Sequence, residues 1–349
     1  MIPQITAVYG ACGGGLAVVP ALSDFSFIES ENGKVFVNAP NTLEGNRADK
    51  LDTSAPEYQA KTTGNIDGIG SEAEIASAIR ELVGILPGNN GMGGLTEECL
   101  DDLNRACESM ESMRKDAHYV IAEIADDHIF VETKKEFAKS MTTGFIRLNG
   151  QTIGVCANNM ELRDEEGNVV GTRDNVICHN GALKAAEFAS FCDAFDIPLL
   201  TITNVKGFMA TVDAEARIAK SVAKMTYTFA NATVPKVSLI TGEAYGSAYA
   251  CFNSKSTGAD LVYAWPTAKF GAMESGMAAK ILYAGEDAAA LKEHAAEYEK
   301  LQGSVTAAAA RGLVDRIVEP ADTRKYLIAA FEMLYTKSVS EVVKKHGTK

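Results

Sequence analysis

The stretch Ile2–Ala17, I-P-Q-I-T-A-V-Y-G-A-C-G-G-G-L-A, decides the fold, because a related stretch occurs again later in the chain. The segment Val234–Tyr249, V-P-K-V-S-L-I-T-G-E-A-Y-G-S-A-Y, aligns with it without a gap. Each copy has an aliphatic residue and a proline, then a strand-like run, then a turn with two matched glycines: Gly10 and Gly14, or Gly242 and Gly246. The sequence therefore predicts, twice, a strand that ends in a glycine turn and leads into an apolar segment.

Three further landmarks repeat in the same order. They are S-D-F-S-F at Ser23–Phe27 with A-D-L-V-Y at Ala259–Tyr263, G-K-V-F-V at Gly33–Val37 with A-K-F-G-A at Ala268–Ala272, and G-N-I-D-G-I at Gly64–Ile69 with G-L-V-D-R-I at Gly312–Ile317. A helix with apolar periodicity is predicted after the last landmark of each copy, over Glu72–Leu86 and Thr323–Leu334. Matched landmarks in one order predict two homologous domains.

The second copy is preceded by a long segment, between His118 and Val234, that has no counterpart before the first. Its predicted strands are Tyr119–Ile124, Ile129–Val131, a hairpin turning at Asn149-Gly150, and Pro198–Val205, and its predicted helices are Ala182–Phe195 and Ala214–Phe229. A helix pair is predicted within Glu286–Ala310. The alternation indicates an α/β architecture with largely parallel pairing. The glycine-rich run Gly88–Gly94 and the acidic T-E-E-C-L-D-D at Thr96–Asp102 are typical of a linker, so we expect domains over 1–115 and 116–349.

Composition excludes several classes of protein. The 349 residues are 46% hydrophobic and 23% charged, which is typical of a globular chain with a substantial core. A net charge of −13 argues against nonspecific nucleic-acid binding. No apolar run reaches the ~18 residues that a membrane span needs, and no signal-peptide pattern is present, so a cytoplasmic location is expected. Seven cysteines without C-x-x-C spacing, and scattered histidines at 118, 128 and 179, predict reduced thiols and no metal site.

The glycine turns favour a site for negative charge. A helix that follows such a turn presents unpaired backbone N–H groups, which can hold an anion or a developing oxyanion. C-G-G-G-L lacks both the lysine of a P-loop and the spacing of a dinucleotide fingerprint. Gly246-Ser247-Ala248 lacks the flanking glycines of a nucleophile elbow. Because the turn occurs at equivalent positions of a repeat, we interpret it as functional rather than as a packing device.

Five stretches carry a resemblance to a known family: Gly144–Val155, Phe191–Leu200, A-Y-G-S-A at Ala244–Ala248, G-A-D-L-V-Y-A-W-P at Gly258–Pro266, and R-G-L-V-D-R-I-V-E-P-A-D-T-R at Arg311–Arg324. With these, the chain closely resembles the carboxyltransferase subunits of biotin-dependent acyl-CoA carboxylases and the α subunits of the related decarboxylases. The resemblance implies an α/β fold of two crotonase-like (ClpP/crotonase) β-β-α superhelical domains, of which the N-terminal one is incomplete here. It places the acyl-CoA site in the N-terminal domain and the biotin site in the C-terminal domain of a partner subunit.

The implied reaction moves a carboxyl group between carboxybiotin, on a separate carrier, and the α-carbon of an acyl-CoA. Two enolate-like anions form, and one preorganised donor to such an oxygen can contribute ~2.7–4 kcal/mol. Carried over from the family, Gly14 and Gly15 serve the thioester oxygen. Gly246, Ser247 and Ala248 serve the biotin oxygen, and the residues expected to contact biotin are Gly207, Phe208 and Tyr245.

The chain also departs from the family pattern. Ser247 replaces a common glycine, K-G-F at Lys206–Phe208 replaces P-G-F, and the glycine-rich segment that normally follows is shortened. No M-K-M biotin-attachment motif occurs and nothing resembles an ATP-grasp domain, so a biotin carrier protein and a biotin carboxylase or membrane decarboxylase subunit are expected as separate chains. The resemblance also implies further copies in a dimer-built oligomer such as a hexamer. The incomplete N-terminal domain is expected to reflect either a truncated sequence or a split subunit that a separate chain completes. Two alternatives stay open: a crotonase-type enoyl-CoA hydratase or isomerase, and a noncatalytic assembly subunit.

Individual side chains have competing interpretations. Glu243 is expected to cap or solvate a helix start rather than to act as an acid or base. Trp265 is expected to be buried. Tyr245 and Phe208 fit either a biotin slot or the core. Arg311 and Arg324 are expected to be solvated rather than to meet CoA phosphates.

Overall fold

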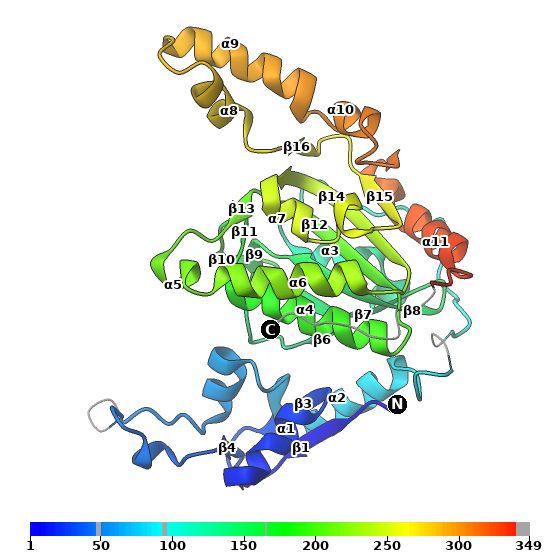
Figure 1. Cartoon of the computed structure of the whole chain (residues 1–349). Helices are drawn as coiled ribbons and strands as arrows, with labels where there is room; N and C mark the ends of the chain where they lie inside the picture. The colour runs from blue at the N-terminus through cyan, green and yellow to red at the C-terminus, as the bar shows by residue number, and fades with distance from the viewer. Residues whose placement is uncertain (47–49, 93–95, 165, 340–349) are drawn as a thin grey trace.

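The computed structural model describes residues 1–46, 50–92, 96–164 and 166–339 (Figure 1). Eight strands of this part form one sheet in the order β17-β15-β14-β12-β8-β7-β6, with β16 also paired to β14. Their bounds are β6 Val131–Thr133, β7 Met141–Leu148, β8 Gln151–Asn158, β12 Leu199–Val205, β14 Lys236–Tyr245, β15 Leu261–Ala264, β16 Lys269–Gly271 and β17 Arg316–Ile317. Only the β6-β7 and β7-β8 pairs of this sheet are antiparallel, so the predicted parallel α/β architecture is confirmed.

Helices cover both faces of this sheet (Figure 1). The helices α4 (His179–Ala194) and α6 (Ile218–Asn231) lie on one face, and α3 (Ala117–Ile124) and α11 (Thr323–Leu334) lie on the other. Successive residues of β12 alternate between the two cores, since Leu199 packs with α4 and α6 whereas Leu200 packs with α3 and α11. Trp265 is fully buried on the α11 side, as predicted, and its indole nitrogen donates to Thr323 Oγ1 at 3.0 Å.

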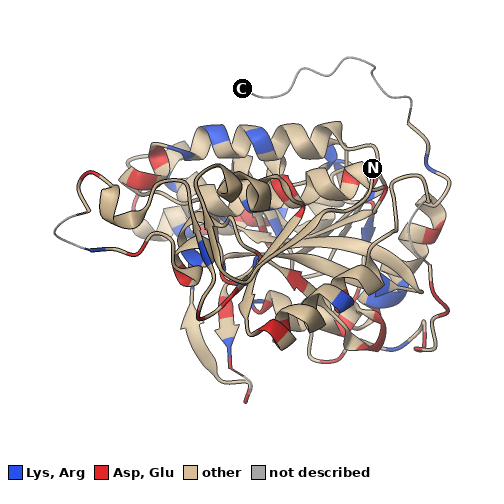
Figure 2. Ribbon diagram, turned by 90° about the horizontal axis from the view of Figure 1, so that it is seen from below, with Lys and Arg blue, Asp and Glu red and all other residues tan. Residues whose placement is uncertain are grey.

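A smaller parallel sheet, β1-β3-β5, is built from the first part of the chain, and β2 pairs with β4 beside it. The bounds here are β1 Ile5–Val8, β2 Ala11–Gly13, α1 Val18–Leu22, β3 Phe25–Glu29, β4 Lys34–Phe36, β5 Gly68–Gly70 and α2 Glu72–Ile85. The sheet joins the larger core through Phe25, whose ring centroid lies 4.8 Å from that of Phe191 on α4. Figure 2, seen from below, shows acidic and basic residues dispersed over the molecule rather than gathered into one basic surface.

The sequence repeat is also a repeat of strand register. The Ile5↔Phe25 pair of β1 and β3 corresponds to Val237↔Leu261 of β14 and β15. In the same alignment, Ala11↔Lys34 corresponds to Glu243↔Lys269, and Phe27↔Gly68 corresponds to Tyr263↔Arg316. Three ladders therefore match residue for residue between the two copies, so the two sets of landmarks build the same local structure.

Several predicted elements are wrong or imprecise. Tyr119–Ile124 is part of helix α3, not a strand, because Asp116 caps it by accepting the N–H groups of His118 and Tyr119. The strand predicted at Ile129 begins only at Val131. The helix predicted over 214–229 is divided into α5 (Val212–Glu215) and α6. The remaining helices are α7 Gly246–Cys251, α8 Ser275–Leu282, which was not predicted, and the expected pair α9 Ala288–Tyr298 and α10 Val305–Ala310.

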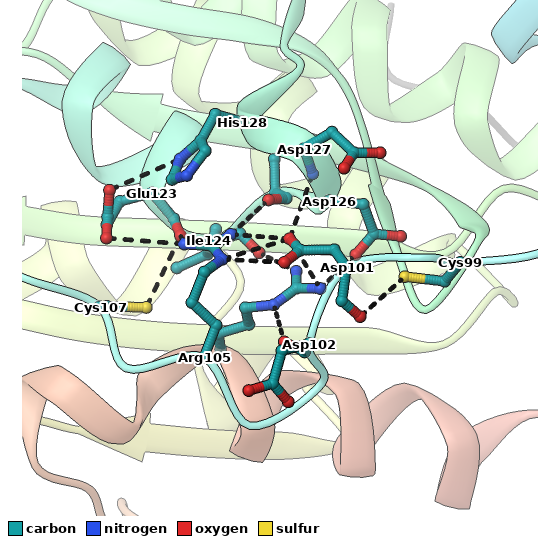
Figure 3. A network of polar contacts seen from close by, with 12 residues as sticks. Cys99, Asp101, Asp102, Arg105, Cys107, Glu123, Ile124, Asp126, Asp127 and His128 are labelled. Carbon is teal, nitrogen blue, oxygen red and sulfur yellow. Dashed lines mark hydrogen bonds and ion pairs between the residues drawn. The ribbon is translucent and has the colours of Figure 1, made fainter.

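A buried ionic network fastens α11 to the segment before the large sheet (Figure 3). Arg324 on α11 has no exposed surface, and it donates to the carbonyl of Ile124 and to Asp126 Oδ1, both at 2.7 Å. Asp101 lies 3.3 Å from the same guanidinium and 3.0 Å from Arg105. The expectation that Arg324 is solvated is therefore wrong. Gly93 and Gly94 of the predicted linker lie outside the described residues, and Asp101 from its acidic end belongs to this network.

Replacing Arg324 by Gln should lower the free energy of unfolding by about 3–5 kcal/mol, because Asp101 and Asp126 would lose a buried countercharge. The adjacent Lys325→Gln is the matched control, since its ion pair with Asp322 is 39% exposed on both sides and should matter by less than about 0.5 kcal/mol. Urea unfolding of the two variants measures the difference. If both variants lowered the free energy of unfolding equally, the buried network would make no specific contribution to stability.

One pair of aspartates distinguishes the two copies. Asp67 and Asp315 occupy equivalent positions and accept equivalent backbone N–H groups, from Ser26 at 2.8 Å and from Val262 at 2.7 Å. Asp315 also pairs with Lys255 at 2.7 Å. The Oδ1 atom of Asp67 is buried without a hydrogen-bond partner among the described residues. Burial raises the pKa of Asp67 to about 6, although the charge of Lys134 opposes the shift.

Replacing Asp67 by Asn should increase stability, whereas Asp315→Asn should decrease it. The folded pKa of Asp67 lies above the unfolded value of 3.8, so its ionisation destabilises the fold progressively as the pH rises from about 4 to 6. Asp67→Asn removes this destabilising charge, so it should raise the free energy of unfolding by about 1–3 kcal/mol at pH 8 and by almost nothing at pH 4. Free energies of unfolding measured across this range test the sign. A lower free energy of unfolding for Asp67→Asn at pH 8 would show that ionised Asp67 does not destabilise the fold.

Candidate functional site

The turn of the second copy lies where β14 ends and α7 begins. Gly246 opens α7 at φ 59°, and a Cβ there would come within 2.9 Å of the Ala272 carbonyl oxygen, so glycine is required on two grounds. No side chain caps this helix. The first-turn N–H groups of a helix have no intrahelical acceptor, so those at the start of α7 are available to a ligand. Ser247 is exposed and Ala248 is buried.

The turn of the first copy has a glycine with a similar φ angle, although a 3₁₀ helix rather than an α-helix follows it. Gly14 has φ 62° and begins a 3₁₀ helix over Gly14–Ala17, again without a side-chain cap. Gly14 is half-buried like its counterpart Gly246, and Gly15 is exposed like Ser247. A Cβ at Gly15 would meet no heavy atom within 4 Å, so the backbone here is open to an approaching group. Sequence alignment, strand register and the glycine φ angle therefore agree between the two turns, whereas the third aligned position differs, since Leu16 is exposed and Ala248 is buried.

The residues predicted to contact biotin lie around the second turn. The short strand β13 (Gly207–Phe208) pairs with β11 (Val176–Ile177) and contacts α7. Phe208 is half-buried and packs against the main core, so it presents part of its ring outward. Tyr245 is 6% exposed, and burial raises its pKa to about 12, which keeps the phenol neutral.

A polar network behind this turn was missed by the sequence reasoning. Asn175 Nδ2 donates to Glu243 Oε2 at 2.6 Å and to Asn204 Oδ1 at 3.2 Å. Asn204 Oδ1 also accepts the Glu243 N–H at 2.9 Å, and the Asn158 amide bonds the Asn204 backbone. Glu243 is thus held by Asn175 and caps no helix, contrary to the expectation. The sequence feature that could have predicted this network is an asparagine at the carboxyl end of each of two neighbouring strands, Asn158 on β8 and Asn204 on β12.

The two turns do not meet within one chain. Figure 1 shows α1, which follows the first turn, in the lower part of the molecule, whereas α7, which begins at the second turn, lies above α6 and below α8. The structure therefore brings together one set of predicted residues, Gly207, Phe208, Tyr245, Gly246, Ser247 and Ala248. It keeps Gly14 and Gly15 apart from that set.

Other kinds of site find no support among the described residues. No three His, Cys, Asp or Glu side chains there are grouped to hold a metal ion, and His118 instead lies 3.1 Å from Glu132. The seven cysteines are free thiols. Within the described ranges, every helix is too short or too polar to cross a bilayer. Arg311 is exposed and donates to the carbonyls of Leu301 and Gln302.

Comparison with known proteins gives one consistent answer. The carboxyl transferase domain family matches residues 1–348. The putative propionyl-CoA carboxylase beta chain of Bacillus subtilis (strain 168) is 38% identical over 365 positions, which cover 99% of this chain and 69% of that protein. The methylmalonyl-CoA decarboxylase subunit alpha of Propionigenium modestum is 34% identical, with the same two coverages.

A solved structure agrees with these relatives. The crystal structure of transcarboxylase 12S with hydrolysed methylmalonyl-coenzyme A bound has a TM-score of 0.88 and 31% identity, and the match covers 99% of this chain and 68% of that one. The crotonase-like fold inferred from the sequence is thereby confirmed. The chain belongs to the carboxyl transferase family and is a subunit of the biotin-dependent acyl-CoA carboxyltransferase kind, found in carboxylases and decarboxylases.

Proposed function

We propose that the two glycine turns are the two oxyanion sites of carboxyl transfer between biotin and an acyl-CoA. Backbone N–H groups of Gly14 and Gly15 stabilise the thioester oxygen while the acyl α-carbon is an enolate. The N–H groups at Gly246, Ser247 and Ala248 stabilise the ureido oxygen of biotin. The observation that carries the proposal is that both turns follow strands of matching register and begin with a glycine of similar φ angle, 62° and 59°.

The second turn has the features that a ureido ring requires. Biotin, attached to a carrier protein, supplies the carboxyl group and takes up negative charge on its oxygen. The exposed backbone at Ser247 offers N–H groups without a side-chain acceptor, and the half-buried ring of Phe208 on β13 offers an apolar wall nearby. Such donors act without reorganisation, so they stabilise the charge as it develops.

Separation of the turns supports an oligomeric enzyme. Since α1 and α7, which follow the two turns, lie apart in one chain (Figure 1), the first turn of one copy would face the second turn of another. The transcarboxylase 12S relative is described as a hexamer. We take residues 1–115 as the acyl-CoA part and 116–349 as the biotin part. The other proposed partners are a biotin carrier protein and a biotin carboxylase or membrane decarboxylase subunit. The proposed location of this chain is the cytoplasm.

Ser247 gives the sharpest test of the second oxyanion site. Proline at this position removes the N–H group, and Ser247→Ala, which keeps it, is the matched control. We expect Ser247→Pro to lower kcat by about 10²–10³-fold and Ser247→Ala to change it little. The assay is decarboxylation of methylmalonyl-CoA by the purified chain with free biotin as acceptor, beside thermal unfolding of each variant.

A second pair of variants avoids any effect of proline on the turn. Ser247→Asp keeps the N–H group but sets a carboxylate beside the developing anion, whereas Ser247→Asn is nearly isosteric and neutral. The Asp variant alone should lose activity. Full activity of both Ser247→Pro and Ser247→Asp would refute the assignment, and a wild-type chain that neither turns over nor binds the CoA ester would favour the noncatalytic assembly subunit.

A further inference from the structure

A separate cavity of 420 Å³ opens beside the end of β14. Its walls come from the residues before α3, the β9–β10 hairpin (Glu161–Arg163 and Val169–Thr172), the loop that follows the hairpin, and the ends of β12 and β14. We infer that this cavity binds an oxyanion, either a phosphate group or a carboxylate. Anion binding here is independent of the roles proposed for Gly15 and Ser247, which do not line the cavity.

The cavity is positively charged in a chain whose net charge is −13. Eight charged side chains line it: the basic Arg114, Lys115, Arg173, Lys206 and Lys269, and the acidic Glu161, Asp174 and Glu243. Two of these are already paired, Lys269 with Glu299 at 2.7 Å and Glu161 with Arg163 at 2.8 Å. The other four cations form no ion pair with any described residue and face two acids, which leaves an excess of two positive charges.

Arg173 decides the kind of ligand. Its backbone N–H donates to the carbonyl of Met160 at 2.8 Å, which fixes the residue at the rim of the hairpin. The residue is half-buried and lines the cavity, its guanidinium forms no ion pair with any described residue, and its covered Nη1 atom has no hydrogen-bond partner there. A buried guanidinium N–H left without an acceptor is costly, and carboxylate or phosphate oxygens match the planar donor geometry of arginine. A neutral ligand would leave the charge uncompensated.

Glu243, one of the two unpaired carboxylates of the cavity, forms no ion pair with this arginine. The Glu243 carboxylate accepts a hydrogen bond from Asn175 Nδ2 at 2.6 Å, and its backbone N–H donates to Asn204 Oδ1. Hydrogen bonds to these two asparagines therefore hold Glu243 in position. The cavity volume lies within the range of small-molecule sites, about 300–1,000 Å³, so it has room for the group that carries the anion as well as for the anion itself.

Isothermal titration of the full chain with inorganic phosphate and, separately, with malonate tests the inference at constant ionic strength. Arg173→Gln should weaken the binding of the preferred anion at least tenfold. Arg217→Gln is the matched control, because Arg217 is 62% exposed, pairs with Asp213 and does not line the cavity. Lys206→Gln, at an exposed position, should weaken binding too, without any effect on folding.

Each outcome decides the matter. Binding of phosphate alone identifies a site for phosphate esters, and binding of malonate alone identifies a site for carboxylates; either supports the inference if Arg173→Gln removes it and Arg217→Gln does not. Binding of neither anion, or equal weakening by Arg173→Gln and Arg217→Gln, overturns it. Thermal unfolding without added anion separates loss of the site from loss of the fold.

Discussion

Parallel pairing of β14 between β12 and β15 is the constraint on which the rest of the structure depends. Nine of its ten residues are buried, so both faces of the strand must be covered by helices. Parallel neighbours also require long crossover connections, which α4, α6 and the segment around β16 provide. The carboxyl ends of the strands then gather at one edge of the sheet. The turn at Gly246, the asparagine network and the basic cavity all lie at that edge, where open α/β sheets usually bind ligands.

The repeated part of the fold could be predicted in detail from the sequence, because aligning the two copies shows which short stretches occupy equivalent positions. The landmark Gly33–Val37 is too short to define a strand alone, yet its alignment with Ala268–Ala272 predicted that the two stretches are equivalent, and they form β4 and β16. Tyr119–Ile124 had no such partner. Its apolar run is compatible with a strand or a buried helix, and the deciding residue was Asp116, which lies just outside it and caps α3.

Tertiary partners explain what could not be predicted at the candidate site. The glycines of both turns could be found, because positive φ angles restrict residue type locally. Asn158, Asn175 and Asn204 come together only when β8 and β12 pair, and each is an ordinary polar residue in the sequence. Arg324 shows the same limit, since its burial depends on Asp101 and Asp126, which lie some two hundred residues earlier in the chain.

The helix α9 stands apart from this cooperative core. None of its residues is buried, and Figure 1 shows it with α8 at the far end of the molecule from the N-terminal sheet. A helix of 11 residues is marginal in water by its own propensity, because nucleation offsets most of the gain from its hydrogen bonds. Its contacts are mainly with α8, at whose end Tyr283 stacks on His294 with ring centroids 3.7 Å apart, so we expect this arm to open at a lower free energy than the sheet and the turns attached to it.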